Sequence, residues 1–233
     1  MIVGKQKPLE EIWSMIEKYH KVLVFGCNTC VAVCHEGGNK EAQILASMLR
    51  MKAKQEGINI EIKDSGIERQ CEHEYFNSAA EEIEWADAIL SIACGAGIQF
   101  LNEKWQAKII LPGLNTTFIG VVDEPGVFSE RCLMCGDCIL HLTGGICPIA
   151  RCSKSIMNGP CGGSTNGWCE IKPITPCGWQ LIHDRLEIQG RIELLEEIIP
   201  AKDWVHSRDG GPRKLVQEHL INDKGVASNG GQE

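Results

Sequence analysis

Eight of the thirteen cysteines in this 233-residue chain lie between Arg131 and Gly178, and this crowding strongly limits how the chain can fold. The same stretch is rich in glycine and poor in aliphatic side chains, so it cannot bury a hydrophobic core of ordinary size. Metal coordination commonly orders segments of this kind. We therefore expect metal-bound thiolates to hold this part of the chain together.

So many cysteines would also suit a secreted protein stapled by disulfides, but the N-terminal sequence argues against secretion. The residues MIVGKQKPLEEIWSMIEKYHK lack the charged start, apolar run and small-residue cleavage site of a signal peptide. No stretch approaches the ~18 consecutive apolar residues that a membrane span requires. We expect a cytoplasmic chain without a membrane span, whose thiols stay reduced and available to metals.

The net charge of the chain is −8, from 31 acidic and 23 basic side chains. A negative charge of this size repels the phosphates of nucleic acids and the surfaces of anionic lipids. Nucleic acid is therefore not an expected partner.

Before residue 113, short apolar segments alternate with amphipathic ones. Segments such as KVLVFGC are apolar and β-branched, whereas EAQILASMLRMKAK repeats its apolar residues at the helical period. This alternation predicts an α/β fold with an open, mostly parallel sheet and helices on both faces. The expected order is helix 8–19, strand 21–27, helix 37–57, strand 58–64, helix 77–86, strand and turn 87–97, helix 98–105 and strand 107–112.

The composition predicts three regions along the chain. Residues 1–128 form the α/β domain with a cysteine cluster site, residues 129–180 a small cysteine-rich iron-sulfur or zinc module, and residues 181–233 a C-terminal helix and flexible tail. Across the start of the last region, residues 179–199 return to helical periodicity. From His206 onward the chain is polar, glycine-rich and weakly periodic, so we expect it to be mobile or ordered only against a partner.

Cys132, Cys135 and Cys138 follow one another at three-residue intervals, and Cys147 directly precedes Pro148. Zinc modules commonly use C-x-x-C pairs, which leaves a third thiolate at the same interval without an obvious role. A C-x-x-C-x-x-C loop with a remote C-P is typical of [4Fe–4S] binding, although the eight-residue gap before Cys147 departs from the bacterial pattern. These residues predict one [4Fe–4S] cluster, with a zinc ribbon as the alternative.

A second tetrad follows in the same region, with eight, seven and seven residues between its members. Its members are Cys152, Cys161, Cys169 and Cys177. The gaps match no compact cluster loop, but glycine turns in NGPCGG and NGWCE could bring the sulfurs together. Zinc and another cubane both fit, and structural zinc is favoured because a closed tetrahedral site needs neither exposure nor a redox role. The eight cysteines could also be divided differently between the two sites.

A third group of cysteines lies in the α/β domain. Cys27, Cys30 and Cys34 fall in GCNTCVAVCHEGG after one predicted strand, and Cys94 falls in SIACGAG after another. Because ligands of open α/β sheets bind at the carboxyl ends of neighbouring strands, these four residues predict a second [4Fe–4S] cluster. Cys71, in ERQCE, is left as a spare thiol, an alternative metal ligand or a redox thiol. The alternative is that some of these cysteines are small buried hydrophobes, which applies to Cys94 more than to Cys27, Cys30 and Cys34.

The segment ERCLMCGDCILHLTGGICPIARCSKSIMNGPCGG, together with GWCE, Cys177 and Trp179, resembles the methylenetetrahydrofolate reductase C-terminal domain family. The segments FGCNTCVAVCHEGG and ERQCE are more loosely similar to it. As a separate chain, this family forms the small subunit of acetogen-type methylenetetrahydrofolate reductase. The resemblance implies an iron-sulfur and zinc subunit that partners a flavin-containing catalytic subunit with a barrel fold, on which the folate site is expected.

These features predict an electron-transfer subunit that has no catalytic residues of its own and passes electrons through iron-sulfur clusters to the flavin of its partner. Gly95 and Gly97 lack the third glycine of a dinucleotide fingerprint, and two-electron reduction of a methylene carbon suits a flavin. The expected upstream donor is ferredoxin or an NADH-oxidising module. Two alternatives are a cluster-linked thiol or disulfide reductase acting through Cys71, and a structural zinc scaffold.

Overall fold

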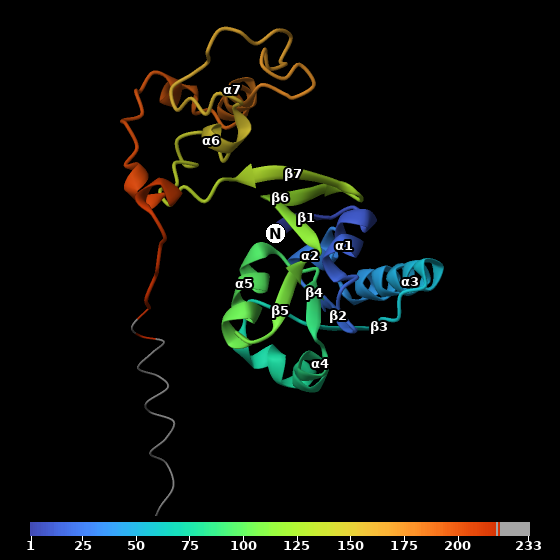
Figure 1. Cartoon of the computed structure of the whole chain (residues 1–233). Coiled ribbons are helices and arrows are strands. Elements are labelled where there is room, and N and C mark those ends of the chain that lie inside the picture. Colours follow the sequence, from blue (N-terminus) through green and yellow to red (C-terminus); the bar gives the residue numbers. More distant parts are fainter. Residues whose placement is uncertain (218, 220–233) are drawn as a thin grey trace, which may run out of the picture. The chain divides into compact units, whose positions relative to one another are not determined.

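A parallel sheet of four strands forms the centre of the first of two units into which the chain divides. The computed structural model describes residues 1–217 and 219, and its units are Met1–Cys132 and the residues from Leu133 onward (Figure 1). In sheet order the strands are β3 (Glu61–Ile67), β2 (Lys21–Cys27), β4 (Ala88–Ser91) and β5 (Ile109–Pro112). Neighbouring strands all run parallel, as the alternating sequence pattern predicted.

One face of this sheet packs against two helices. Val22 and Val24 of β2 and Leu90 of β4 are fully buried on this face. They contact the buried residues of α1 (Leu9–Ile16) and the apolar stripe of α3 (Asn39–Glu56). Burying one such aliphatic side chain contributes about 1.5–3 kcal/mol, so this layer is a main source of the unit's stability.

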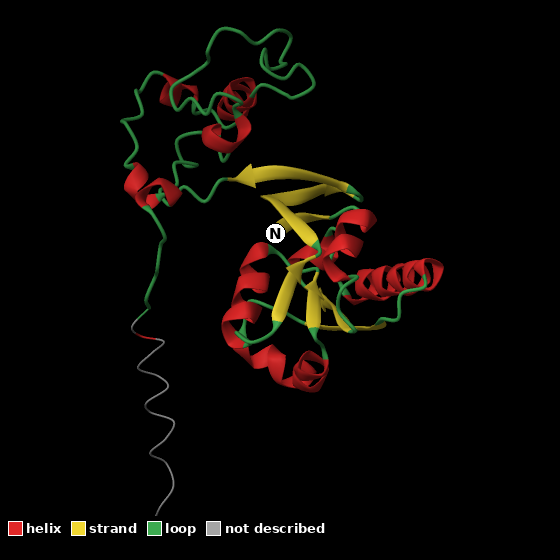
Figure 2. Cartoon of the chain, in the orientation of Figure 1, coloured by secondary structure: helices red, strands yellow, loops and turns green. Residues whose placement is uncertain are grey.

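The opposite face is covered by η1 (His73–Ala79), α4 (Ala80–Trp85) and α5 (Gly95–Lys104). Leu23 and Phe25, which alternate with the two valines along β2, are fully buried against these helices. Successive side chains of a strand point to opposite faces, so the unbroken apolar run of β2 marks a strand covered on both sides. The expected α/β fold with helices on both faces is confirmed (Figure 2).

The first unit also contains a three-stranded antiparallel sheet that the sequence pattern did not predict. Its strands are β1 (Ile2–Gln6), β6 (Leu114–Glu124) and β7 (Val127–Cys132), with β6 in the centre. Most of β6 is exposed or half-buried, so it shows little of the apolar alternation that identifies a strand. The partner of β1 is also distant in sequence, since Ile2 lies opposite Ile119.

The second unit consists mainly of loops joined by short helical segments. These segments are α6 (Pro148–Arg151), α7 (Gly178–Ile188), η2 (Ile192–Leu195), η3 (Trp204–His206) and η4 (Arg208–Gly210). The pattern of residues 179–199 predicted one continuous helix, but α7 ends at Ile188, shortly before Gly190 with φ of 62°. A positive φ favours glycine and commonly terminates a helix. A small apolar core in this unit is formed by Cys177, Trp179, Ile182 and Leu186.

No helix within residues 1–217 and 219 is long and apolar enough to cross a membrane. Residue 218 and residues 220–233, which belong to the predicted flexible tail, lie outside the described part of the chain. The start of that tail contacts its own unit, because Arg213 Nη1 donates a hydrogen bond to the Met134 carbonyl at 2.6 Å. This portion of the tail is therefore held by the chain itself.

Candidate metal centres

The carboxyl edge of the parallel sheet brings together loops that carry cysteines. The chain passes from β3 to β4 across β2, so the direction of strand addition reverses between β2 and β4. Ligands of open α/β sheets bind outside the carboxyl ends of the strands at such a switch point. Cys27 is the last residue of β2, and Cys94 directly precedes α5, the helix that follows β4.

Gln70, in the loop after β3, is fully buried and connects this loop to the ends of β2 and β4. Its Nε2 donates hydrogen bonds to the carbonyls of Phe25 at 3.0 Å and Gly26 at 2.9 Å. Its Oε1 accepts a hydrogen bond from the Ser91 hydroxyl at 2.7 Å. Sequence analysis missed this residue, because a lone glutamine in a polar segment gives no sign of burial. Gln70 thereby holds its neighbour Cys71 at the edge of the sheet.

The cysteines of these three loops influence one another electrostatically. Cys27 is buried, Cys94 and Cys30 of α2 (Cys30–Val33) are partly exposed, and Cys71 is exposed. Burial raises the pKa of the Cys71 thiol, and negative charge on Cys94 or Cys30 raises it further. Burial also raises the pKa of Cys27, with a smaller contribution from Cys94. Bound metal would offset these effects, because its positive charge favours the thiolate.

Cys34 directly follows α2. Its Sγ donates to the Val31 carbonyl at 3.3 Å and to the Gly4 carbonyl of β1 at 3.8 Å. The side chain belongs to an apolar cluster with Val3 and Leu114, where Cys27 and Val31 also lie. Burial raises the pKa of the Cys34 thiol, and the nearby carboxylate of Glu36 raises it further. These surroundings favour a neutral thiol.

The second tetrad predicted from the sequence lines one small cavity of the second unit. The cavity is bordered by Cys152, Cys161, Cys169 and Cys177, together with Lys154, Ser164, Glu170, Gly178 and Trp179. Its volume of about 10 Å³ is close to the space that one water molecule needs. Four thiols around one cavity are ligands of the type that binds zinc or an iron-sulfur cluster.

Backbone contacts in the second unit bring distant members of this tetrad to the cavity. The Cys169 N–H donates to the Thr175 carbonyl at 2.9 Å, and the Cys177 N–H donates to the Gly167 carbonyl at 2.7 Å. A side-chain carbon at Gly178 would lie 2.7 Å from the carbonyl oxygen of Arg151, so glycine lets the start of α7 approach the residue before Cys152.

Polar groups around this cavity affect the charge of two of its thiols. The Ser153 hydroxyl lies 3.3 Å from the Sγ of Cys169. Hydrogen bonding by that hydroxyl, and then by backbone groups of the following turn, lowers the pKa of Cys169. The Cys161 thiol donates to the Glu170 carboxylate at 3.5 Å, and the same carboxylate forms an ion pair with Lys154. Metal binding requires thiolates, and these hydrogen bonds make the Cys169 thiolate easier to form.

The loop with three-residue cysteine intervals is turned by residues in the left-handed region, Met134 with φ of 53° and Gly136 with φ of 83°. Cys132 ends β7 in the first unit, whereas Cys135 and Cys138 belong to the second. Cys147, the predicted fourth ligand, directly precedes α6. Cys132 and Cys138 are exposed, and Cys135 and Cys147 are partly exposed.

Two basic side chains from the C-terminal segment lie against this loop. The amine of Lys202, whose side chain is completely buried, donates to the Asp137 carbonyl and lies 3.4 Å from the Asp137 carboxylate. Arg213 binds the Met134 carbonyl, as described above, and also donates to the His206 carbonyl at 3.1 Å.

Within residues 1–217 and 219, no group of three or more histidine, cysteine, aspartate and glutamate side chains is close enough together to hold a metal ion as it stands. The cysteine loops are adjacent at the sheet edge and around the small cavity, but their side chains would have to move for shared coordination.

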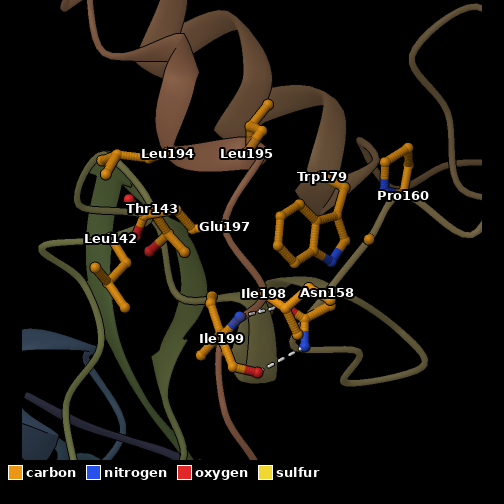
Figure 3. A pocket seen from close by; sticks show the side chains of 11 residues that line it. Leu142, Thr143, Asn158, Pro160, Trp179, Leu194, Leu195, Glu197, Ile198 and Ile199 are labelled. Atoms are coloured by element: carbon orange, nitrogen blue, oxygen red, sulfur yellow. Dashed lines mark hydrogen bonds between the residues drawn. The ribbon is translucent and has the colours of Figure 1, made fainter.

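Trp179 is one of the residues that line a second, larger cavity of about 200 Å³ (Figure 3). The same residue also lines the small cavity. Asn158 closes the larger cavity by exchanging two hydrogen bonds with Ile199: Nδ2 donates to the carbonyl at 2.9 Å, and Oδ1 accepts from the N–H at 2.8 Å. Leucine and isoleucine side chains of residues 194–199 complete the wall. This contact fastens the segment after α7 to the cysteine-rich loops.

The chain thus contains an α/β fold followed by a cysteine-rich stretch between residues 130 and 180. Residues 111–205 match the family model described as methylene-tetrahydrofolate reductase C terminal. The match includes all eight cysteines from Cys132 to Cys177 and links the chain to methylenetetrahydrofolate reductase. Neither a curated protein nor a solved structure matches the chain.

Proposed function

We propose that this chain is the small, MetV-type subunit of a methylenetetrahydrofolate reductase complex and passes electrons to the flavin of a partner catalytic subunit. The observation that carries the proposal is the match over residues 111–205, which spans the cysteine-rich module. The meeting of cysteine loops at the ligand-binding edge of the α/β sheet supports it from a separate part of the chain.

The cysteines would hold metal at three places. Two [4Fe–4S] clusters are proposed, one at the sheet edge and one at Cys132, Cys135, Cys138 and Cys147. Zinc is proposed at the small cavity, whose four thiols suit one ion. When bound, iron-sulfur clusters supply single-electron chemistry, whereas reduction of a methylene carbon takes two electrons and suits a flavin.

The chain's own residues would position these sites near the surface. Cys71, Cys132 and Cys138 are exposed, so electrons could enter and leave without a deep channel. Gln70 fixes one cysteine loop, while Lys202 holds another. The proposed partners are the flavin-containing subunit and an upstream donor such as ferredoxin or an NADH-oxidising module, in the cytoplasm.

A thiol or disulfide reductase acting through Cys71 is the weaker proposal. The exposure of Cys71 favours it, since an attacking thiol must be accessible. The raised pKa of Cys71 weighs against it, because reactive cysteines have a lowered pKa. We therefore prefer the electron-transfer role to a thiol or disulfide reductase.

The test is an anaerobic assay with methylenetetrahydrofolate and an artificial reductant. The chain alone, a flavoprotein partner alone and the mixture are compared for methyl-tetrahydrofolate formation. We expect turnover only when the flavoprotein is present, and faster electron delivery from the donor when the chain is added. Steady product formation by the isolated chain would overturn the proposal. The proposal would also fail if the donor reduced the flavoprotein equally fast with and without the chain.

A further inference from the structure

We propose that the cluster at the sheet edge is bound by Cys27, Cys30, Cys71 and Cys94, and that Cys34 is a packing residue. This inference rests on the proposed function, because it assumes an iron-sulfur cluster at that edge. Compared with the ligand set predicted from the sequence, Cys71 of the loop after β3 takes the place of Cys34. Three adjacent loops, rather than two, would then supply the ligands.

The position of Cys71 carries the argument, because two independent contacts fix its neighbour Gln70. The amide of Gln70 spans the ends of β2 and β4 through its bonds to Phe25, Gly26 and Ser91. A side-chain carbon at Gly97 would lie only 3.0 Å from Cβ of Gln70, so the first turn of α5 lies directly against this loop.

The Cys27 thiol faces the same loop. Its Sγ lies 3.9 Å from the carbonyl oxygen of Glu68, three residues before Cys71. The backbone N–H of Asn28 also donates to the carbonyls of Ile67 and Glu68, at 3.0 and 3.1 Å. The loops after β2 and β3 are therefore in contact where their cysteines lie, and the loop before α5 adjoins them with Cys94.

Cys34 shares an apolar cluster with Cys27, and Cys94 packs against that cluster. The Cys34 thiol, however, is directed to the carbonyls of Val31 and Gly4 rather than to the loop after β3. Nearby, the Glu36 carboxylate accepts a hydrogen bond from the Gln6 N–H at 2.7 Å, so the acidic side chain is fixed on the same side. A nearby carboxylate disfavours a second negative charge on the Cys34 sulfur.

The test compares Cys71→Ala with Cys34→Ala in the full-length chain, purified without oxygen. Iron and sulfide per chain are measured, and the reduced proteins are examined by electron paramagnetic resonance. We expect Cys71→Ala to lose about half of the iron and one of two cluster signals, since each [4Fe–4S] cluster holds four irons. Cys34→Ala should keep both.

Cys34→Ser is measured alongside, because a buried alanine could disturb packing. Retention of the iron by either Cys34 variant supports the proposal when Cys71→Ala loses it. If Cys71→Ala keeps its full iron content, the proposal is overturned. It is also overturned if both Cys34 variants lose as much iron as Cys71→Ala while their circular dichroism spectra match that of the unaltered chain. The iron content of the unaltered chain tests the proposed function separately, since absence of iron there would overturn both.

Discussion

The two units of this chain position their cysteines by opposite means. In the first unit, layers of buried aliphatic and aromatic side chains on both faces of a sheet form a scaffold, and the thiols sit at its edge. In the second, a core of four buried residues includes one of the proposed ligands, Cys177. In the first unit the packed sheet places the cysteines, whereas in the second unit the proposed metal would itself contribute to the fold.

The largest expected effect comes from removing one ligand of the small cavity. Cys161→Ala should abolish zinc binding, and amide protection in residues 148–179 should be lost, because structural zinc supplies about 10–16 kcal/mol in small zinc peptides. Hydrogen exchange followed by mass spectrometry measures this by segment. Ser164→Ala, at the same cavity, is the matched control. Full protection in a zinc-free variant would show that the second unit folds without metal.

The converse experiment removes core from the first unit. Phe25→Ala, at a fully buried side chain of β2, should lower the free energy of unfolding by about 3–5 kcal/mol, because it leaves a cavity in a packed layer. Denaturant titration followed by circular dichroism gives the value. Ile44→Ala, at a half-exposed position of α3, should change it by less than about 0.5 kcal/mol. Zinc content should stay unchanged, and its loss would mean that the units are not independent.

A smaller effect is expected at Gln70, which joins scaffold and site. Gln70→Leu should cost about 1–3 kcal/mol, because it leaves buried carbonyls without a donor, and it should weaken iron retention at the sheet edge. Iron analysis after dialysis tests the second effect. Gln99→Leu is the control, since that amide donates only within the first turn of α5. Stable iron in Gln70→Leu would remove Gln70 from the account of the site.

The smallest effect is expected on the surface of the scaffold, at Lys52. Hydrogen bonding to Lys52 lowers the pKa of Glu56 below its usual value of 4.5, so this pair stabilises the fold above that pH and ceases to do so as Glu56 is protonated. Lys52→Met should therefore lower the melting temperature slightly at pH 7 and leave it unchanged near about pH 3. An equal shift at both pH values would show that packing, rather than charge, explains the change.

The sequence was sufficient for the parallel sheet, because each of its strands and helices carries its own apolar period. It was insufficient for the antiparallel sheet, where Ile2 of β1 meets Ile119 of β6 and pairing depends on contacts far apart in the chain. The helix expected over residues 179–199 was too long, since one left-handed glycine interrupts an otherwise helical pattern.

In the candidate sites, too, local features were predictable from the sequence and long-range contacts were not. Spacing alone grouped the four cysteines that line the small cavity, because glycine turns between them are local features. Spacing also grouped Cys34 with Cys27 and Cys30, and this grouping stays a prediction. The roles of Gln70 and Asn158 depend on long-range hydrogen bonds that no motif encodes.

The measurement that tests the central claim most directly is the iron, sulfide and zinc content of the full-length chain purified without oxygen. Two [4Fe–4S] clusters and one zinc ion predict about eight iron, about eight acid-labile sulfide and about one zinc per chain. The visible spectrum should bleach on reduction. A colourless protein that contains zinc and no iron would contradict electron transfer and leave a structural scaffold.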